Sequence, residues 1–296
     1  MAKHARNENS HSDHLYDPVD TGGGDLLAFL QEDSPASHVK HHAGIVHNQP
    51  QHHHAQHHEA NEHGVGNLFS SAFLHADALF FAHIDPLNNS GVHGEAVLAL
   101  NGNILTVEIA ATGLDPAFND ATGMNQVHPV HIHGFPDGNP DSKVPTLAAD
   151  TDHDGFIEVA EGGPDYGPIL LSLTHNGQFP TAPSGTFIFT QTYQLPSGAI
   201  PSPIQALNEL GLNTDVPLDR REIVIHGLTL QAGQGATNAD SIVPPIGLNE
   251  ADGTPGYKAA LPVAAGEIQD SHGNSALAQF VNGLDALGIH SQDWHI

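Results

Sequence analysis

Two histidines at alternating positions are the clearest candidates for metal chemistry in the sequence. The stretch HPVHIHG contains His128, His131 and His133. Residues i and i+2 of a β-strand lie on the same face, so His131 and His133 project together. Two imidazoles at this spacing can hold one copper or zinc ion. The alternative is that they are two surface histidines on an exposed face, which gives the same sequence pattern. His128 stands at an odd spacing and joins the pair only if Pro129 kinks the chain.

A later stretch, EIVIHG, offers a third histidine. Ile223 and Ile225 face one side of the predicted strand, whereas Val224 and His226 face the other. If this strand lies next to the HIH strand, His226 supplies a third nitrogen ligand and leaves one position open for water or substrate. The alternative is a histidine that is hydrogen-bonded in the core.

An acidic segment between these stretches resembles the calcium loop of EF-hands. Residues Asp150–Glu161 read DTDHDGFIEVAE and fit the pattern D-x-D-x-D-G-x-I-x-x-x-E. The following Gly-Gly-Pro is expected to stop an exiting helix, so we expect a lone calcium loop with a structural role inside an insertion. A solvated acidic turn is the alternative. The predicted Ca²⁺ ligands are Asp150, Asp152, Asp154, the carbonyl of Phe156, Glu158 and the bidentate Glu161.

The composition excludes several classes of function. Lys and Arg number 7 against 34 Asp and Glu, which gives a net charge of −27. Such a chain repels nucleic-acid phosphates and anionic lipid surfaces, so we expect neither as a partner. The absence of cysteine excludes disulfides, thiolate zinc sites, iron–sulfur centres and cysteine catalysis. The 25 histidines in an acidic chain indicate a protein that handles metal ions.

The chain divides into three parts by composition. Residues 1–66 hold 13 of the 25 histidines, and their low-complexity tract predicts a flexible, disordered arm. That arm is expected to bind Cu²⁺, Ni²⁺ or Zn²⁺ without a preformed fold, or to be a soluble linker that binds metal incidentally. Residues 67–270 form the predicted β-domain, with the calcium loop at 150–161 inserted, and residues 271–296 form a C-terminal helical tail.

Short β-patterned runs separated by glycine and proline predict an all-β fold. We expect a Greek-key antiparallel barrel or sandwich with long loop insertions and a short C-terminal helix. No apolar run is long enough for a membrane-spanning helix. The predicted strands are Phe80–Ile84, Glu95–Leu100 and Ile104–Ala110 as a hairpin, Val127–His133, Ile169–Leu173, Thr186–Tyr193, Glu222–Leu230 and Ala259–Ile268; the predicted helices are Pro203–Leu210 and Ala276–Leu287.

The segments HPVHIHGF and IVIHG resemble the copper-binding strands of the Cu/Zn superoxide dismutase family. The family pattern H-V-H-x-F-G with a later V-V-H implies a Greek-key barrel in which His131, His133 and His226 bind copper. The run LPVAAGEI, with the hairpin and HIHG, resembles CHRD (chordin-type) domains. No recognisable zinc loop follows His133, and the family's disulfide is impossible, so a copper-only or simple metal-binding barrel fits better.

These features favour an exported metal-binding protein that carries Ca²⁺ in the acidic loop and Cu²⁺ or Zn²⁺ at the histidines. One alternative is a superoxide dismutase-like redox enzyme at the same histidines. Another is an extracellular structural protein that self-assembles, as a homo-oligomer or matrix, in response to metal or pH. The N-terminal residues lack the apolar core of a secretory signal, so we expect a cytoplasmic chain, a chain exported by a signal-independent route or a mature form. The absence of cysteine, the acidity and the many Gly, Asn and Asp residues favour an extracellular or cell-surface location reached by a signal-peptide-independent route.

Overall fold

The computed structural model describes residues 69–116, 127–196, 217–235, 255–271 and 275–290. The predicted arm (1–66), the predicted helix at 203–210 and the last residues of the tail lie outside this range. The described residues belong to one compact unit. None of the helices within these ranges is long and apolar enough to cross a membrane.

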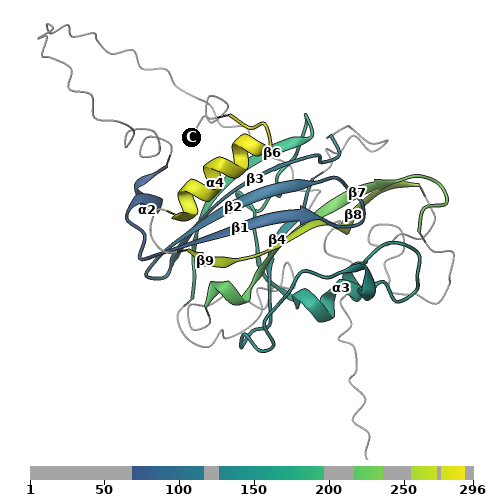
Figure 1. Ribbon diagram of the computed structural model, residues 1–296, viewed down its shortest axis with the longest axis horizontal. Coiled ribbons are helices and arrows are strands. Elements are labelled where there is room, and N and C mark those ends of the chain that lie inside the picture. The colour runs from purple at the N-terminus through teal and green to yellow at the C-terminus, as the bar shows by residue number, and fades with distance from the viewer. Residues whose placement is uncertain (1–68, 117–126, 197–216, 236–254, 272–274, 291–296) are drawn as a thin grey trace, which may run out of the picture. The chain divides into compact units, whose positions relative to one another are not determined.

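Antiparallel strands form one curled, half-barrel sheet (Figure 1). Its strands follow the order β5-β4-β7-β8-β1-β2-β3-β6, and β9 pairs with β1. Neighbours that are distant in sequence, such as β4 and β7, are joined by long insertions. The predicted all-β antiparallel fold is confirmed. The strands are β1 Ala78–Pro86, β2 His93–Asn101, β3 Ile104–Thr112, β4 Val130–His133, β5 Ile169–Ser172, β6 Thr186–Gln194, β7 Glu222–Leu230, β8 Gly256–Glu267 and β9 Gln269–Ser271.

The hairpin β2–β3 has the tight turn that the sequence predicts. Asn101 pairs with Ile104, and only two residues connect the strands. Gly102 adopts a positive φ of 57°, a conformation that tight hairpin turns require and that glycine adopts without strain.

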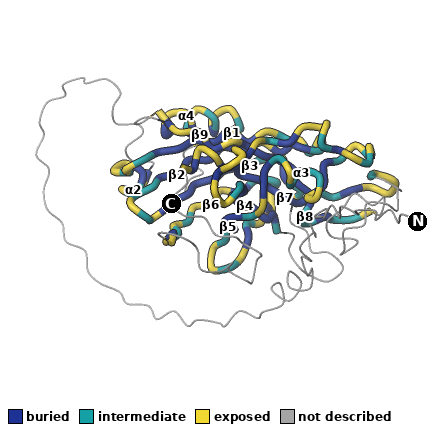
Figure 2. Tube along the Cα trace, turned by 90° about the horizontal axis from the view of Figure 1, so that it is seen from below, coloured by how far each residue is buried: buried dark blue, intermediate teal, exposed yellow. Residues whose placement is uncertain are grey.

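Alternation along the strands divides the buried residues between the two faces of the sheet. On β3, Leu105, Val107 and Ile109 belong to the main core, whereas Ala110 belongs to a second core on the opposite face. The strands are buried along most of their length, and the connecting turns are exposed (Figure 2).

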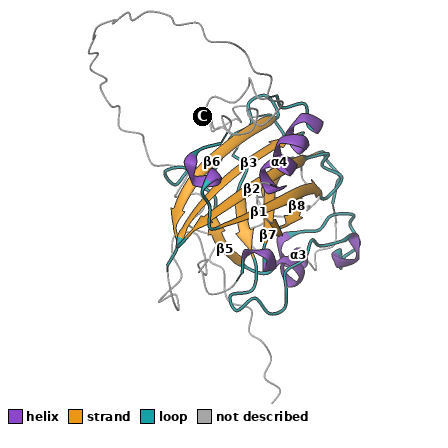
Figure 3. Cartoon of the chain, turned by 60° about the vertical axis from the view of Figure 1, so that its left-hand side comes forward, coloured by secondary structure: helices purple, strands orange, loops and turns teal. Residues whose placement is uncertain are grey.

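The helices are short and lie on the outside of the sheet. Helix α4, Ser275–Ala286, packs on β1 and β2 and covers the second core together with α2, Ser71–Leu74 (Figure 3). The predicted C-terminal helix is thus confirmed. Two 3₁₀ turns, Leu147–Ala149 and Leu218–Arg220, precede the acidic loop and β7.

The expected helix stop after the acidic loop is wrong. Helix α3, Val159–Tyr166, runs through both glycines and contains Pro164. Glu158 and Glu161 form a capping box, in which each side chain accepts a hydrogen bond from the backbone N–H of the other residue at the start of the helix. Pro164 removes only one helical hydrogen bond in so short a helix. Gly162 packs so closely against Tyr166 that a Cβ at this position would overlap Cε1 of that ring. Tertiary packing therefore outweighs the local helix-breaking signal.

Candidate metal centre

Three histidines from two paired strands converge in the interior. His131 and His133 lie on β4, which pairs with β7, and the backbone N–H of His226 donates to the Pro129 carbonyl at 2.8 Å. One side-chain nitrogen from each histidine lies within 4.8 Å of the other two. The exposed fractions of His131, His133 and His226 are only 7%, 2% and 3%. We call His131, His133 and His226 the three-histidine cluster.

The pleat of β4 explains how two of these side chains come together. Val130 and Ile132 point into the main core, so the intervening His131 and His133 must point to the opposite face. Their ring centroids are 5.5 Å apart, and that of His131 lies 5.0 Å from that of His226. The register between β7 and β8 shifts on both sides of His226, so the regular strand pairing is interrupted at this residue.

Backbone carbonyls fix the orientation of two of the rings. Nδ1 of His133 donates to the Gly167 carbonyl at 2.9 Å, and Nδ1 of His226 donates to the Ala260 carbonyl at 2.6 Å. Because a carbonyl can only accept, each Nδ1 must carry the proton, and each neutral ring keeps a lone pair on Nε2. These Nε2 atoms and Nδ1 of His131 are buried without a hydrogen-bond partner among the described residues.

Burial keeps the cluster uncharged. Desolvation lowers the pKa of His131 well below its usual value, and the neighbouring His226 and His133 lower it further. Desolvation, followed by the effect of His226, lowers the pKa of His133 to about 3. Desolvation likewise lowers the pKa of His226 to about 4. All three imidazoles are therefore neutral at pH 7, which is the form that binds metal ions.

Aromatic rings surround the cluster. The ring of Tyr166 packs edge-on against His133 with centroids 4.7 Å apart, and Phe179 packs against His131 at 5.3 Å. Both aromatic residues are buried. The sequence offered no signal for Tyr166 or Phe179, because each comes from a connection outside the two histidine strands.

A buried carboxyl group beside the cluster was also missed. Glu222 is the cross-strand partner of His133, and its oxygens have no hydrogen-bond partner within the described ranges. Burial, followed by the charges of Glu267 and Asp165, raises the pKa of Glu222 to about 8, so this group is mostly protonated at pH 7. The two-residue periodicity of β7 already places it on the same face as His226.

His128 does not join the cluster. Its Nδ1 lies 3.1 Å from the carbonyl of His226, and its Nε2 lies 3.0 Å from the carbonyl of Asp115. The chain enters β4 only at Val130, and the His128 ring is turned toward these carbonyls. The predicted role of His128 as a metal ligand is therefore corrected to that of a buried residue that links two backbone segments.

The acidic loop brings its predicted ligands together in two overlapping groups. One oxygen from each of Asp150, Asp152 and Glu161 lies within 4.8 Å of the others, and the same holds for Asp152, Asp154 and Glu158. The loop begins directly after a 3₁₀ turn and ends inside α3. Carboxylates at such separations repel one another unless a cation or a proton lies between them.

Backbone N–H groups hold the aspartates of the loop in place. Asp150 accepts from the backbone of His153, Asp154 and Gly155 at 2.6–3.2 Å. Asp154 accepts from the backbone N–H of Phe156 at 2.8 Å. The Phe156 carbonyl, the remaining predicted ligand, therefore belongs to the same tight turn. Gly155 has a φ of +92°, which explains the glycine at the sixth position.

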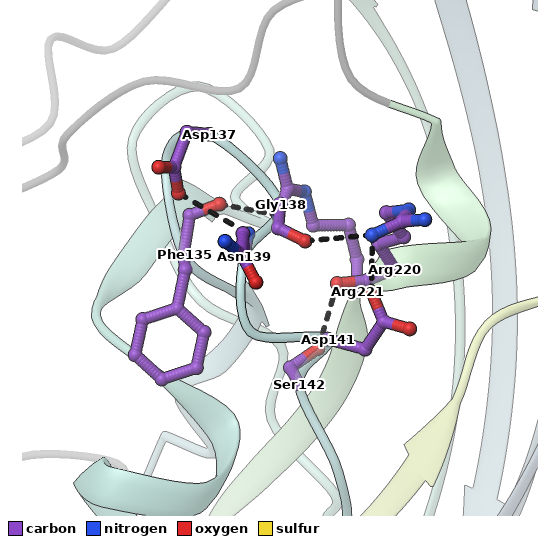
Figure 4. A network of polar contacts seen from close by, with 8 residues as sticks. All are labelled: Phe135, Asp137, Gly138, Asn139, Asp141, Ser142, Arg220 and Arg221. Carbon is purple, nitrogen blue, oxygen red and sulfur yellow. Dashed lines mark hydrogen bonds and ion pairs between the residues drawn. The ribbon is translucent and has the colours of Figure 1, made fainter.

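A polar network joins the segment after the HIH strand to the start of β7 (Figure 4). Arg220 donates to Asp141 at 2.6 Å and to the Gly138 carbonyl at 3.0 Å. Ser142 donates to the Arg220 carbonyl at 2.9 Å, and Arg221 donates to the Phe135 carbonyl. These contacts join the segment that follows β4 to the residues that precede β7, next to the strand pairing that brings the three histidines together.

Comparison of the chain with protein-family models and with curated proteins finds no match.

Proposed function

We propose that the protein is a metal-binding β-domain protein that holds Cu²⁺ or Zn²⁺ on His131, His133 and His226. The observation that supports this most strongly is the convergence of three buried histidines, each of which has a ring nitrogen without a hydrogen-bond partner among the described residues. A buried polar atom left unsatisfied costs about 1–3 kcal/mol. One metal ion would satisfy all three nitrogens at once.

The donor set fits these metals. Neutral imidazoles suit copper and zinc, and three protein ligands leave one position for water or another small ligand. The carbonyls of Gly167 and Ala260 orient two of the rings, in the way that outer-shell acceptors orient metal-bound histidines. Bound copper would supply one-electron redox chemistry, whereas bound zinc would act as a Lewis acid.

We propose in addition that the acidic loop binds Ca²⁺. The all-oxygen donor set of carboxylates and one carbonyl suits a hard cation. The twelve-residue pattern and the two carboxylate groups support this assignment. A bound Ca²⁺ would offset the repulsion between five acidic side chains and so order the loop. An affinity of about 10⁻⁴–10⁻³ M suffices in the proposed extracellular setting.

Elemental analysis of the full chain, purified without metal-affinity steps, tests both sites. We expect His226→Ala to contain about one transition-metal ion less per chain than the wild type, because a three-ligand site rarely survives the loss of one ligand. His93→Ala is the matched control, since His93 is exposed and outside the cluster. Glu161→Gln should remove calcium, because the bidentate carboxylate is lost, and should leave the transition metal. Equal copper and zinc contents in wild type and His226→Ala would contradict the proposal.

A superoxide dismutase-like redox activity is the second candidate. The supporting observation is that three groups converge among the residues that the structure describes, which leaves room for a small reactant on copper. Copper-loaded wild type should then disproportionate superoxide in the presence of EDTA, which suppresses catalysis by free copper, and His226→Ala should not. The absence of EDTA-resistant activity in the wild type would exclude this candidate.

A further inference from the structure

Helix α3 connects the acidic loop to the three-histidine cluster. At its N-terminus, Glu158 and Glu161 of the loop form the capping box. At its C-terminus, the carbonyl of Gly167 accepts from His133, and the ring of Tyr166 packs on the ring of His133. Eight helical residues span only about 12 Å at 1.5 Å per residue, so the two sites lie at the opposite ends of one short helix.

The helix is braced along its length. The hydroxyl of Tyr166 donates to the carbonyl of Val159, the first helical residue, at 3.1 Å. The ring of Tyr166 also lies directly against Gly162. Tyr166 is 1% exposed and packs with Val224 and Ala265 of the strands β7 and β8. Tyr166 therefore connects the first turn of α3 directly to His133.

Asn88 provides a second connection. Its side chain accepts from the backbone N–H of Ile157 at 2.7 Å and donates to the carbonyls of Ile157 and Pro262 at 3.0 and 2.9 Å. Pro262 is the cross-strand partner of His226, and the nearby Ala260 carbonyl orients the His226 ring. The middle of the acidic loop is thus tied to the strand that positions another histidine of the cluster.

We propose that Ca²⁺ in the acidic loop and a transition metal at the three-histidine cluster bind with positive coupling, each raising the affinity for the other. This inference rests on the proposed function, because it requires both sites. Ca²⁺ would draw the carboxylates of Glu158 and Glu161 inward and fix the first turn of α3. That turn determines where Gly167 and Tyr166 meet His133. Linkage makes the effect reciprocal, and couplings of this kind are about 5–150-fold, so we expect about tenfold.

The test is a titration of the full chain with Co²⁺, followed by visible absorption, with and without saturating Ca²⁺. Subtracting the titration of His226→Ala removes the signal of histidines outside the cluster. We expect Ca²⁺ to lower the Co²⁺ dissociation constant of the cluster about tenfold. Saturating Co²⁺ should lower the Ca²⁺ dissociation constant by the same factor.

Two variants interrupt the connections without removing a proposed ligand. Tyr166→Phe deletes the bond to the Val159 carbonyl, and Asn88→Ala deletes the bonds to Ile157 and Pro262. Both metals should still bind, and the coupling factor should fall below about threefold. The matched controls are Tyr193→Phe and Asn103→Ala, whose side chains donate to carbonyls in other parts of the sheet. These controls should keep the full factor.

The outcomes separate the coupling from the proposed function. Equal Co²⁺ affinities with and without Ca²⁺, with both sites filled, would overturn the coupling and leave the proposed function intact. A full coupling factor in both Tyr166→Phe and Asn88→Ala would overturn the route through α3 and Asn88. Absence of His226-dependent Co²⁺ binding, or of Ca²⁺ binding, would overturn the proposed function and the coupling together.

Discussion

Replacing Glu108 by glutamine should markedly reduce the loss of unfolding free energy that the protein shows as pH rises. Glu108 is 1% exposed on the face of β3 opposite the main core, and one of its oxygens has no hydrogen-bond partner among the described residues. Burial raises the pKa of this carboxyl group from 4.5 to about 7. One pKa unit corresponds to about 1.4 kcal/mol, so ionising Glu108 in the folded state costs about 3 kcal/mol.

The sign of the effect follows from the raised pKa of Glu108. The stability contributed by its protonated carboxyl is fully present below about pH 4.5 and is lost as pH rises through about 7. The glutamine side chain has nearly the same shape and stays neutral, so Glu108→Gln should not show this loss. Any constant cost of burying an amide cancels when one variant is compared with itself at two pH values.

Urea denaturation of the full chain, followed by circular dichroism at low protein concentration, measures this difference. Between about pH 5 and about pH 8, the wild type should lose about 2–3 kcal/mol more unfolding free energy than Glu108→Gln. Asp270→Asn, at an exposed carboxylate of β9, is the control and should follow the wild type. Parallel pH profiles for wild type and Glu108→Gln would show that ionisation of Glu108 does not destabilise the fold.

Three further outcomes follow from the packing and from the charge. Gly283→Ala should destabilise the fold by about 1–3 kcal/mol in urea denaturation, because its Cβ would overlap Cδ of the buried Glu95; an unchanged midpoint would contradict this contact. Saturating Zn²⁺ should raise the unfolding free energy of the wild type more than that of His226→Ala, by about 4 kcal/mol at a thousandfold excess over the dissociation constant; equal shifts would argue against binding at the cluster. Protonation of most of the 25 histidines, the buried cluster excepted, would offset much of the −27 charge, so light scattering should rise between about pH 8 and about pH 5.5, and a flat profile would exclude acid-induced assembly.

Side-chain periodicity allowed much of the cluster to be predicted from sequence. The direction of His131 and His133 depends only on the pleat of one strand, and the same holds for Ile223 and Ile225. The contact of His226 with the other two histidines depends on the pairing of β4 with β7, which no local rule supplies. From the sequence, this contact could be predicted only on the condition that the two strands are neighbours.

The two errors arose where distant contacts decide local structure. The acidic residues Glu158 and Glu161 were interpreted only as cation ligands, although the same pair caps a helix. Buried Tyr166 then stabilises that helix across the glycines and Pro164. His128 was included as a ligand because its ring partners, the carbonyls of residues 115 and 226, cannot be read from its own strand.

The two proposed sites differ in charge and in donor atoms. Each site therefore favours one of the two proposed metals by its chemistry, and not by affinity alone. The acidic loop offers only oxygen donors, which suit Ca²⁺. The cluster offers three neutral nitrogens, and the nearest buried carboxyl on its strand, Glu222, is mostly protonated at pH 7. In a chain with a net charge of −27, such a site lacks the ionised oxygens that Ca²⁺ needs. Under the proposed coupling, Ca²⁺ would therefore act on the cluster from a distance, through α3 and Asn88, and not by competing for its nitrogens.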